Sequence, residues 1–175
     1  MNSAILDTSI LIKLGSKKVG SAVSTIISTD LKDADLFISE ICCYEFLRGV
    51  ESRADVLTKQ SFLKKWPRLP VDKELLKIAT YYYNILFKHS THTGGTAFNM
   101  RQFSDSDIFI GATSIQNAML VCTVNGADFP RPLFEEVSVT KISQNEKVYI
   151  LKPDTDYFLA ETQKFMDPPI KKNSH

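Results

Sequence analysis

In the stretch AILDTSILIKL, residues 4–14, an apolar run leads directly into a carboxylate, Asp7, and the apolar pattern then resumes. The residues before Asp7 have the pattern of a short buried strand, and Thr8 and Ser9 follow the acid. A buried charge costs several kcal/mol unless it is paired, solvated or bound to a cation. Asp7 therefore either closes a capped turn after the strand or belongs to a site, and the remaining sequence has to distinguish the two.

Short apolar runs alternate with segments of helical periodicity along the chain. The expected strands cover residues 3–7, 34–39, 119–124, 137–142 and 147–151. The expected helices cover residues 19–31, 40–49, 52–66, 72–88, 108–118 and 156–165, with Ser39 and Asp72 as caps. In the helix after Asp72 the expected buried face is Leu75, Leu76, Ala79, Tyr82 and Leu86. This alternation predicts an α/β fold, a short parallel sheet flanked by helices in three layers.

The sequence predicts one main domain, residues 1–152, followed by a C-terminal extension, residues 153–175, with a short helix and a frayed tail. Residues 89–103 show no period, which predicts a loop or lid. His89 and His92 lie there without a cysteine or third ligand at zinc spacing, so ordinary loop histidines are the favoured interpretation.

Composition places the chain among soluble globular proteins, with 43% hydrophobic and 23% charged residues. The net charge of +1 gives no global basic field that would indicate a nucleic-acid partner, although a local patch remains open. We expect no signal peptide and no membrane segment, because no apolar run approaches the roughly 20 residues that a membrane helix needs. The three cysteines, Cys42, Cys43 and Cys122, lie in apolar runs and predict reduced thiols in a cytoplasmic protein.

Four acids lie close to the carboxyl ends of the expected strands: Asp7, Glu45, Asp107 and Asp128. In open α/β sheets, sites form just beyond those ends. Carboxylates gathered there would repel one another, and a divalent cation relieves that repulsion. Oxygen ligands without cysteine or histidine select Mg²⁺ or Mn²⁺, which suit phosphodiester hydrolysis. We therefore expect the four carboxylates within about 10 Å of one another, since paired ions lie about 4 Å apart.

Four motifs carry a resemblance to a known family. They are ILDTS at 5–9, E-x-x-R-G at 45–49, D-x-x-I-x-A at 107–112 and T-x-N-x-x-D-F at 123–129. In this order and spacing the chain resembles the PIN-domain ribonucleases, and most of all a VapC-type toxin of bacterial toxin–antitoxin modules. The motifs span about three quarters of the chain, so the resemblance covers the expected sheet edge as a whole.

The resemblance implies that Asp7, Glu45, Asp107 and Asp128 form an acidic, catalytic Mg²⁺ or Mn²⁺ site. It implies that Thr8 or Ser9, together with Asn125, orients the carboxylates or bound water. It also implies an endoribonuclease acting on structured RNA such as tRNA or rRNA, a cognate antitoxin that inserts a segment beside the acids, and a homodimer.

Some features depart from the family pattern. The chain is longer than most such toxins, and the polar segment 89–103 replaces a compact turn. Asp105 competes with Asp107 as the third acid, and we favour Asp107 because IFIGA follows it directly. Gly111 occupies a position where the family usually has alanine.

Each acid also has a purely structural interpretation. Glu45 has the spacing of a surface pair with Arg48, Asp107 would be favoured by a helix dipole, and Asp128 could close an Asx-type turn. Basic residues between the second acid and Pro70 either line an RNA path or form solvated helix faces. They are Arg48, Arg53, Lys59, Lys64, Lys65 and Arg68. The tyrosines Tyr81, Tyr82 and Tyr83 could stack on bases, but a helix with one or two of them packed inward is favoured.

Two other functions stay open at this point. A catalytically silent PIN-like scaffold would bind RNA or protein without cutting it. An aspartyl-phosphate phosphotransferase also begins with a strand followed by Asp-Thr, but it requires a second acid two residues later, where this chain has Ser9.

Overall fold

A six-stranded mixed sheet forms the centre of the computed structural model, which describes residues 2–92, 100 and 103–166. The strand order is β3-β2-β1-β4-β6-β5. The strands are β1 (Asn2–Leu6), β2 (Ala34–Ser39), β3 (Arg68–Leu69), β4 (Leu120–Thr123), β5 (Phe134–Lys141) and β6 (Lys147–Pro153). The first four run parallel, as the alternating pattern predicted.

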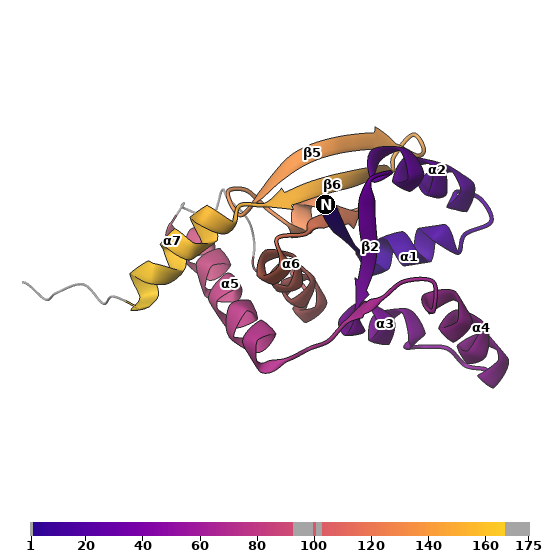
Figure 1. Ribbon diagram of the computed structural model, residues 1–175, viewed down its shortest axis with the longest axis horizontal. Coiled ribbons are helices and arrows are strands. Elements are labelled where there is room, and N and C mark those ends of the chain that lie inside the picture. The colour runs from indigo at the N-terminus through magenta and orange to yellow at the C-terminus, as the bar shows by residue number, and fades with distance from the viewer. Residues whose placement is uncertain (1, 93–99, 101–102, 167–175) are drawn as a thin grey trace, which may run out of the picture.

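Helices lie on both sides of the parallel strands, with α1 and α2 on one side and α5 and α6 on the other (Figure 1). The helices are α1 (Thr8–Leu14), α2 (Gly20–Asp30), α3 (Glu40–Leu47), α4 (Arg53–Leu63), α5 (Lys73–His92), α6 (Asp105–Asn117) and α7 (Thr155–Met166). This arrangement confirms the predicted three-layer α/β fold. None of the helices in the described residues is long and apolar enough to cross a membrane.

Local sequence signals explain where several helices begin. The Ser39 hydroxyl accepts the backbone N–H of Cys42 at the start of α3, at 3.1 Å. The Asp72 carboxylate accepts the backbone N–H of Leu75 at the start of α5, at 2.7 Å. Both caps were predicted, and both are confirmed. The strand β1 that leads into Asp7 is fully buried from Ala4 to Leu6.

Four expectations need correction. Residues 8–14 form the short helix α1, which the apolar pattern did not reveal because its seven residues span only two turns. The helix α5 continues to His92, so residues 89–92 are helical, while residues 93–99 and 101–102 of the expected loop lie outside the described residues. In α5, Leu76 was expected on the buried face but is 48% exposed, while Ile85, which was not expected there, is fully buried. The fourth correction concerns the last two strands.

The strands β5 and β6 form an antiparallel hairpin, and β6 pairs antiparallel with β4. The alternating sequence pattern predicts a parallel sheet throughout, which is wrong for these two strands. The SQNE link between these strands is too short for the crossover that a parallel connection requires, so the second strand returns beside the first. After the hairpin, α7 packs against α5, where Lys88 Nζ donates to Glu161 Oε2 at 2.9 Å.

Candidate functional site

Asp7 follows β1 and begins α1, and its side chain is almost fully buried, with the residue 5% exposed. Ser9 Oγ and Thr123 Oγ1 both donate hydrogen bonds to Asp7 Oδ2, at 2.5 and 2.7 Å. The side chain makes no N-cap hydrogen bond to α1, so the capped-turn interpretation lacks its defining contact. Burial raises the pKa of Asp7; the hydrogen bonds from Ser9 and Thr123 oppose the rise, and Asp107 adds to it.

Glu45 lies on α3 and is linked to α1, because Thr8 Oγ1 donates to Glu45 Oε2 at 2.6 Å. Arg48 Nη2 lies 3.8 Å from Glu45 Oε1. The expected i,i+3 pair with Arg48 therefore exists, but the Glu45 side chain is only 13% exposed, whereas that of Arg48 is 63% exposed. Glu45 is thus a largely buried acid that faces α1.

Asp107 lies in the first turn of α6 and takes part in a capping box with Ser104. The Ser104 backbone N–H and hydroxyl both donate to Asp107 Oδ2, at 2.8 Å each. Burial raises the pKa of Asp107; the hydrogen bonds from Ser104 oppose the rise and Glu45 adds to it. The structural interpretation of Asp107 as a helix-start residue is therefore correct. The same carboxylate also interacts electrostatically with Glu45.

Asp105, the rival third acid, is exposed and lines a separate hollow between α5 and α6 with Leu76 and Tyr83. That hollow contains none of the other three acids. The geometry thus favours Asp107 over Asp105.

Asp128 lies in the short 3₁₀ helix η2 (Gly126–Asp128) that follows β4. Asn125 Nδ2 donates to Asp128 Oδ2 at 2.7 Å, which is a turn-type contact and also orients the carboxylate. Burial, with additions from Asp107 and Asp7, raises the pKa of Asp128 to about 7. At neutral pH the group therefore lies near its midpoint of ionisation.

The three aspartates come from different parts of the fold, and they interact electrostatically. Asp7 is affected by Asp107, and Asp128 by both of them. Within residues 2–92, 100 and 103–166, however, no three His, Cys, Asp or Glu side chains lie close enough together to hold one cation directly. The donor set consists of oxygens alone, which fits Mg²⁺ or Mn²⁺, ions that keep several waters and are often bound through one or two carboxylates.

Tyr82 on α5 is a neighbour of this cluster that sequence reasoning did not assign to it. It is fully buried, and its hydroxyl has no hydrogen-bond partner in the structure. A Cβ built on Gly111 would lie 2.6 Å from Tyr82 Cε1, so the glycine makes room for the ring. Burial raises the pKa of Tyr82, with further contributions from Asp107 and Asp128. An unpartnered buried hydroxyl facing acids fits a site that a polar ligand completes.

The signal for Tyr82 was the glycine at position 111, where alanine was expected. The expectation that one or two of the three tyrosines pack inward is confirmed: Tyr82 is fully buried, Tyr81 is half-buried and Tyr83 is 45% exposed. Thr123, which holds Asp7, was part of the T-x-N motif but received no role. The residues predicted to orient the site, Thr8, Ser9 and Asn125, contact Glu45, Asp7 and Asp128 respectively.

Other candidates from the sequence lie elsewhere or serve local contacts. His89 Nε2 lies 2.7 Å from the Tyr157 hydroxyl, between α5 and α7, and the side chain of His92 is outside the described residues. Among the basic residues, Lys59 Nζ donates to the Phe46 carbonyl at 2.8 Å. The three cysteines are buried and free.

Comparison with known proteins agrees with this geometry. The family model described as "PIN domain" matches residues 4–132, which is more than half of the 175 residues and includes all four acids. Comparison with curated proteins gives no match. Among solved structures, the chain is similar to a chain of VapBC2 from Rickettsia felis bound to a DNA fragment from its promoter. The TM-score is 0.52 at 19% identity, over 72% of this chain and 90% of the other. The chain belongs to the PIN domain family.

Proposed function

We propose that the protein is a metal-dependent endoribonuclease that hydrolyses RNA phosphodiester bonds, and that Asp7, Glu45, Asp107 and Asp128 form its active site. The observation that carries the proposal is the electrostatic interaction among the four acids: the pKa of each aspartate is raised by burial and by another acid, which is Glu45 in the case of Asp107. Perturbed carboxyl groups gathered at one sheet edge are typical of functional sites. Membership of the PIN domain family supports the same conclusion.

The four acids are the residues that would hold Mg²⁺ or Mn²⁺. Such a cation polarises a phosphoryl oxygen and lowers the pKa of a water molecule, which makes hydrolysis possible near neutral pH. Asp7 is the central ligand in this proposal, because it is the most deeply buried of the acids and has two hydroxyl donors on one oxygen. Those hydroxyls, from Ser9 and Thr123, fix the orientation of its carboxylate.

The other residues of the chain position the acids and the RNA. Thr8 holds Glu45, and Asn125 holds Asp128, so that each acid keeps one rotamer before substrate arrives. Arg48 has a 63% exposed side chain beside Glu45, where its guanidinium can contact an RNA phosphate. Water has little access to Asp7, which strengthens its electrostatic interactions.

We also propose that the protein is the toxin of a toxin–antitoxin pair in the cytoplasm, with structured RNA such as tRNA or rRNA as its substrate and a homodimer as its assembly. The fold similarity to a chain of VapBC2 supports this assignment. A cognate antitoxin would cover the acidic site until it is removed.

A catalytically silent scaffold is the second candidate. It is favoured by the absence of three directly ligating side chains among the described residues and by the capping role of Asp107. A phosphotransferase is disfavoured, because the position that needs its second acid holds Ser9, which donates to Asp7.

The test is an RNA cleavage assay with purified protein, free of any antitoxin, on total tRNA. We expect discrete fragments with Mn²⁺ or Mg²⁺ and intact RNA with EDTA. RNA that stays intact with either cation, while the protein still binds it, would support the silent scaffold instead.

A further inference from the structure

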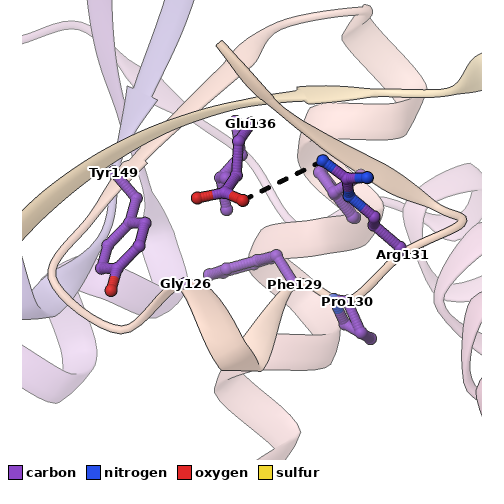
Figure 2. Close-up of a pocket in the computed structure, with 8 residues that line it drawn as sticks. Gly126, Phe129, Pro130, Arg131, Glu136 and Tyr149 are labelled. Carbon is purple, nitrogen blue, oxygen red and sulfur yellow. Dashed lines mark ion pairs between the residues drawn. The ribbon is translucent and has the colours of Figure 1, made fainter. Parts of the chain in front are cut away.

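A pocket of about 280 Å³ opens beside η2 and the β5–β6 hairpin (Figure 2). Ligand pockets span roughly 300–1,000 Å³, so this one has room for a single ring system rather than for a larger ligand. The residues labelled around it are Gly126, Phe129, Pro130, Arg131, Glu136 and Tyr149.

The pocket joins two parts of the chain with different origins. One side comes from residues 126–131, within the segment that matches the PIN family model. The other side comes from β5 and β6, which lie beyond residue 132, where that match ends. The pocket is therefore formed only when the β5–β6 hairpin packs beside residues 126–131.

Two observations place this pocket close to Asp128 and Asp7. Asp128 belongs to η2, the same short segment that contributes Gly126 to the pocket. On β6, Tyr149 pairs directly with Thr123 of β4, and Thr123 Oγ1 donates to Asp7 at 2.7 Å. Directly paired residues on neighbouring antiparallel strands point to the same face of the sheet. The Tyr149 ring is therefore one strand away from the residue that holds Asp7.

Gly126 brings the Tyr149 ring against the backbone of η2. A Cβ at position 126 would lie 2.8 Å from Tyr149 Cδ1, so any larger residue would displace the ring. Tyr149 is partly exposed, while Phe129, which lines the same pocket, is 2% exposed and adds apolar surface. An accessible aromatic ring in a partly apolar pocket is a surface on which a base can stack.

Charged groups complete the rim. Arg131 Nη2 lies 4.0 Å from Glu136 Oε1, with side chains 75% and 49% exposed, so the pair is loose and open to solvent (Figure 2). A carboxylate accepts hydrogen bonds from base N–H groups, and a guanidinium pairs with phosphate. The rim therefore offers contacts to both parts of a nucleotide.

We propose that this pocket binds one unpaired base of the RNA strand that the acidic site cuts. The inference rests on the proposed function, because it takes RNA as the ligand. The base stacks on Tyr149, Glu136 accepts a hydrogen bond from it, and Arg131 contacts the neighbouring phosphate. The β5–β6 hairpin thereby supplies a base preference next to the cleavage site.

The test measures binding of a fluorescein-labelled single-stranded oligoribonucleotide by fluorescence anisotropy in EDTA, where binding is separate from cleavage. Tyr149→Leu should weaken binding at least about fivefold, since it removes the stacking ring, and Tyr149→Phe should keep it. Lys32→Ala is the control: it removes a 71% exposed charge just before β2, which is separated from β6 in the sheet by β1 and β4, and should leave affinity within about twofold.

Competition then identifies the base. Nucleoside monophosphates should displace the oligonucleotide better than ribose 5-phosphate does, and Glu136→Ala, at an exposed position, should reduce the differences among the four monophosphates. Equal competition by ribose 5-phosphate, or unchanged affinity in both Tyr149→Leu and Glu136→Ala, would overturn the pocket assignment. Loss of affinity for a protein antitoxin alone, with RNA binding intact, would overturn it as well. Wild-type protein that binds RNA through this pocket but never cleaves it would refute the proposed function and leave the pocket assignment standing.

Discussion

Among the described residues, Asp7 at the sheet edge and Glu161 on α7 are the two buried acids, and the surroundings of the two regions differ in kind. Glu161 on α7 is 5% exposed and pairs with Lys88 of α5 and with Lys164 of its own helix. The hydrogen bond from Lys164, with support from Lys88, holds the pKa of Glu161 below its usual value. At the sheet edge, Asp7, Asp107 and Asp128 face hydroxyl, amide and acidic groups, and each has a raised pKa.

The difference separates an acid held in a structural ion pair from the acids that we propose as the functional site. In the described part of the chain, Asp7, Asp107 and Asp128 have no Lys or Arg within ion-pair distance. Glu161 has its compensating charges built into the chain and stabilises the contact of α7 with α5. The three aspartates lack such charges in the described residues, so burying them together costs folding free energy, a cost that a bound cation would offset.

The largest expected effect is on catalysis by Asp7→Asn. The change keeps the shape of the side chain and removes the charge that would hold the cation, so RNA cleavage with Mn²⁺ should fall at least about a hundredfold. RNA binding should persist, since one negative charge leaves the site. Asp105→Asn is the matched control, because Asp105 lines a separate hollow, and its loss should be mild. Equal losses in Asp105→Asn and Asp107→Asn would contradict the choice of third acid.

Next in size is the effect of Glu161→Gln on stability. It removes the charge partner of Lys88 and Lys164, and we expect a loss of about 1–2 kcal/mol in the free energy of unfolding, measured by urea denaturation. Cleavage at a temperature where the variant is folded should be unchanged. The control is Glu74→Gln, whose 60% exposed side chain pairs with Lys77 at the surface and should contribute under about 0.5 kcal/mol. A loss of cleavage in folded Glu161→Gln would break the distinction between the two regions.

The two regions should also respond oppositely to pH in metal-free protein. The folded pKa of Asp128, about 7, lies above its ordinary value of 3.8, so its stabilisation is present at low pH and is lost as the pH rises from about 4 through 7. The folded pKa of Glu161 is lowered from 4.5, so its stabilisation is present above that value and is lost as the pH falls below it.

Thermal melting in EDTA between pH 4 and 8, on wild type and Asp128→Asn, isolates the first of these contributions. The difference in Tm between the two proteins should grow toward pH 7 in favour of the variant. A constant difference across this range would mean that Asp128 does not titrate as described.

The smallest expected effect is that of Tyr82→Phe on the metal-free fold. The variant keeps the ring that packs on Gly111 and removes a buried hydroxyl without a partner, so stability should stay equal or rise by up to about 1 kcal/mol. Urea denaturation in EDTA measures it. A clear loss of stability would show that the hydroxyl has a partner in solution.

Much of this molecule could be predicted from local signals. Apolar runs gave β1, β2 and β4, and Ser39 and Asp72 gave the starts of α3 and α5, because these features depend on a few neighbouring residues. The positions of the four acids after strands or in early helical turns followed from the same pattern.

Features that depend on contacts between distant segments could not be predicted. Thr123 holds Asp7 from 116 positions away, and Tyr82 lies against Gly111 of another helix. The pairing of β6 with β4 is likewise a tertiary contact without a local signature. The short helix α1 was not predicted, because its two turns are buried largely through Ile10 and Leu11, and a strand could show the same pattern.

We propose that the acids at the sheet edge hold a divalent cation, whereas Glu161 is compensated by lysines of the chain itself. Calorimetric titration of wild type, Asp7→Asn and Glu161→Gln with Mn²⁺ tests this proposal. We expect wild type and Glu161→Gln to bind Mn²⁺ with similar affinity and Asp7→Asn to bind it at least about tenfold more weakly, a loss of about 1.4 kcal/mol or more. Equal Mn²⁺ binding by wild type and Asp7→Asn, or no binding by wild type, would contradict it.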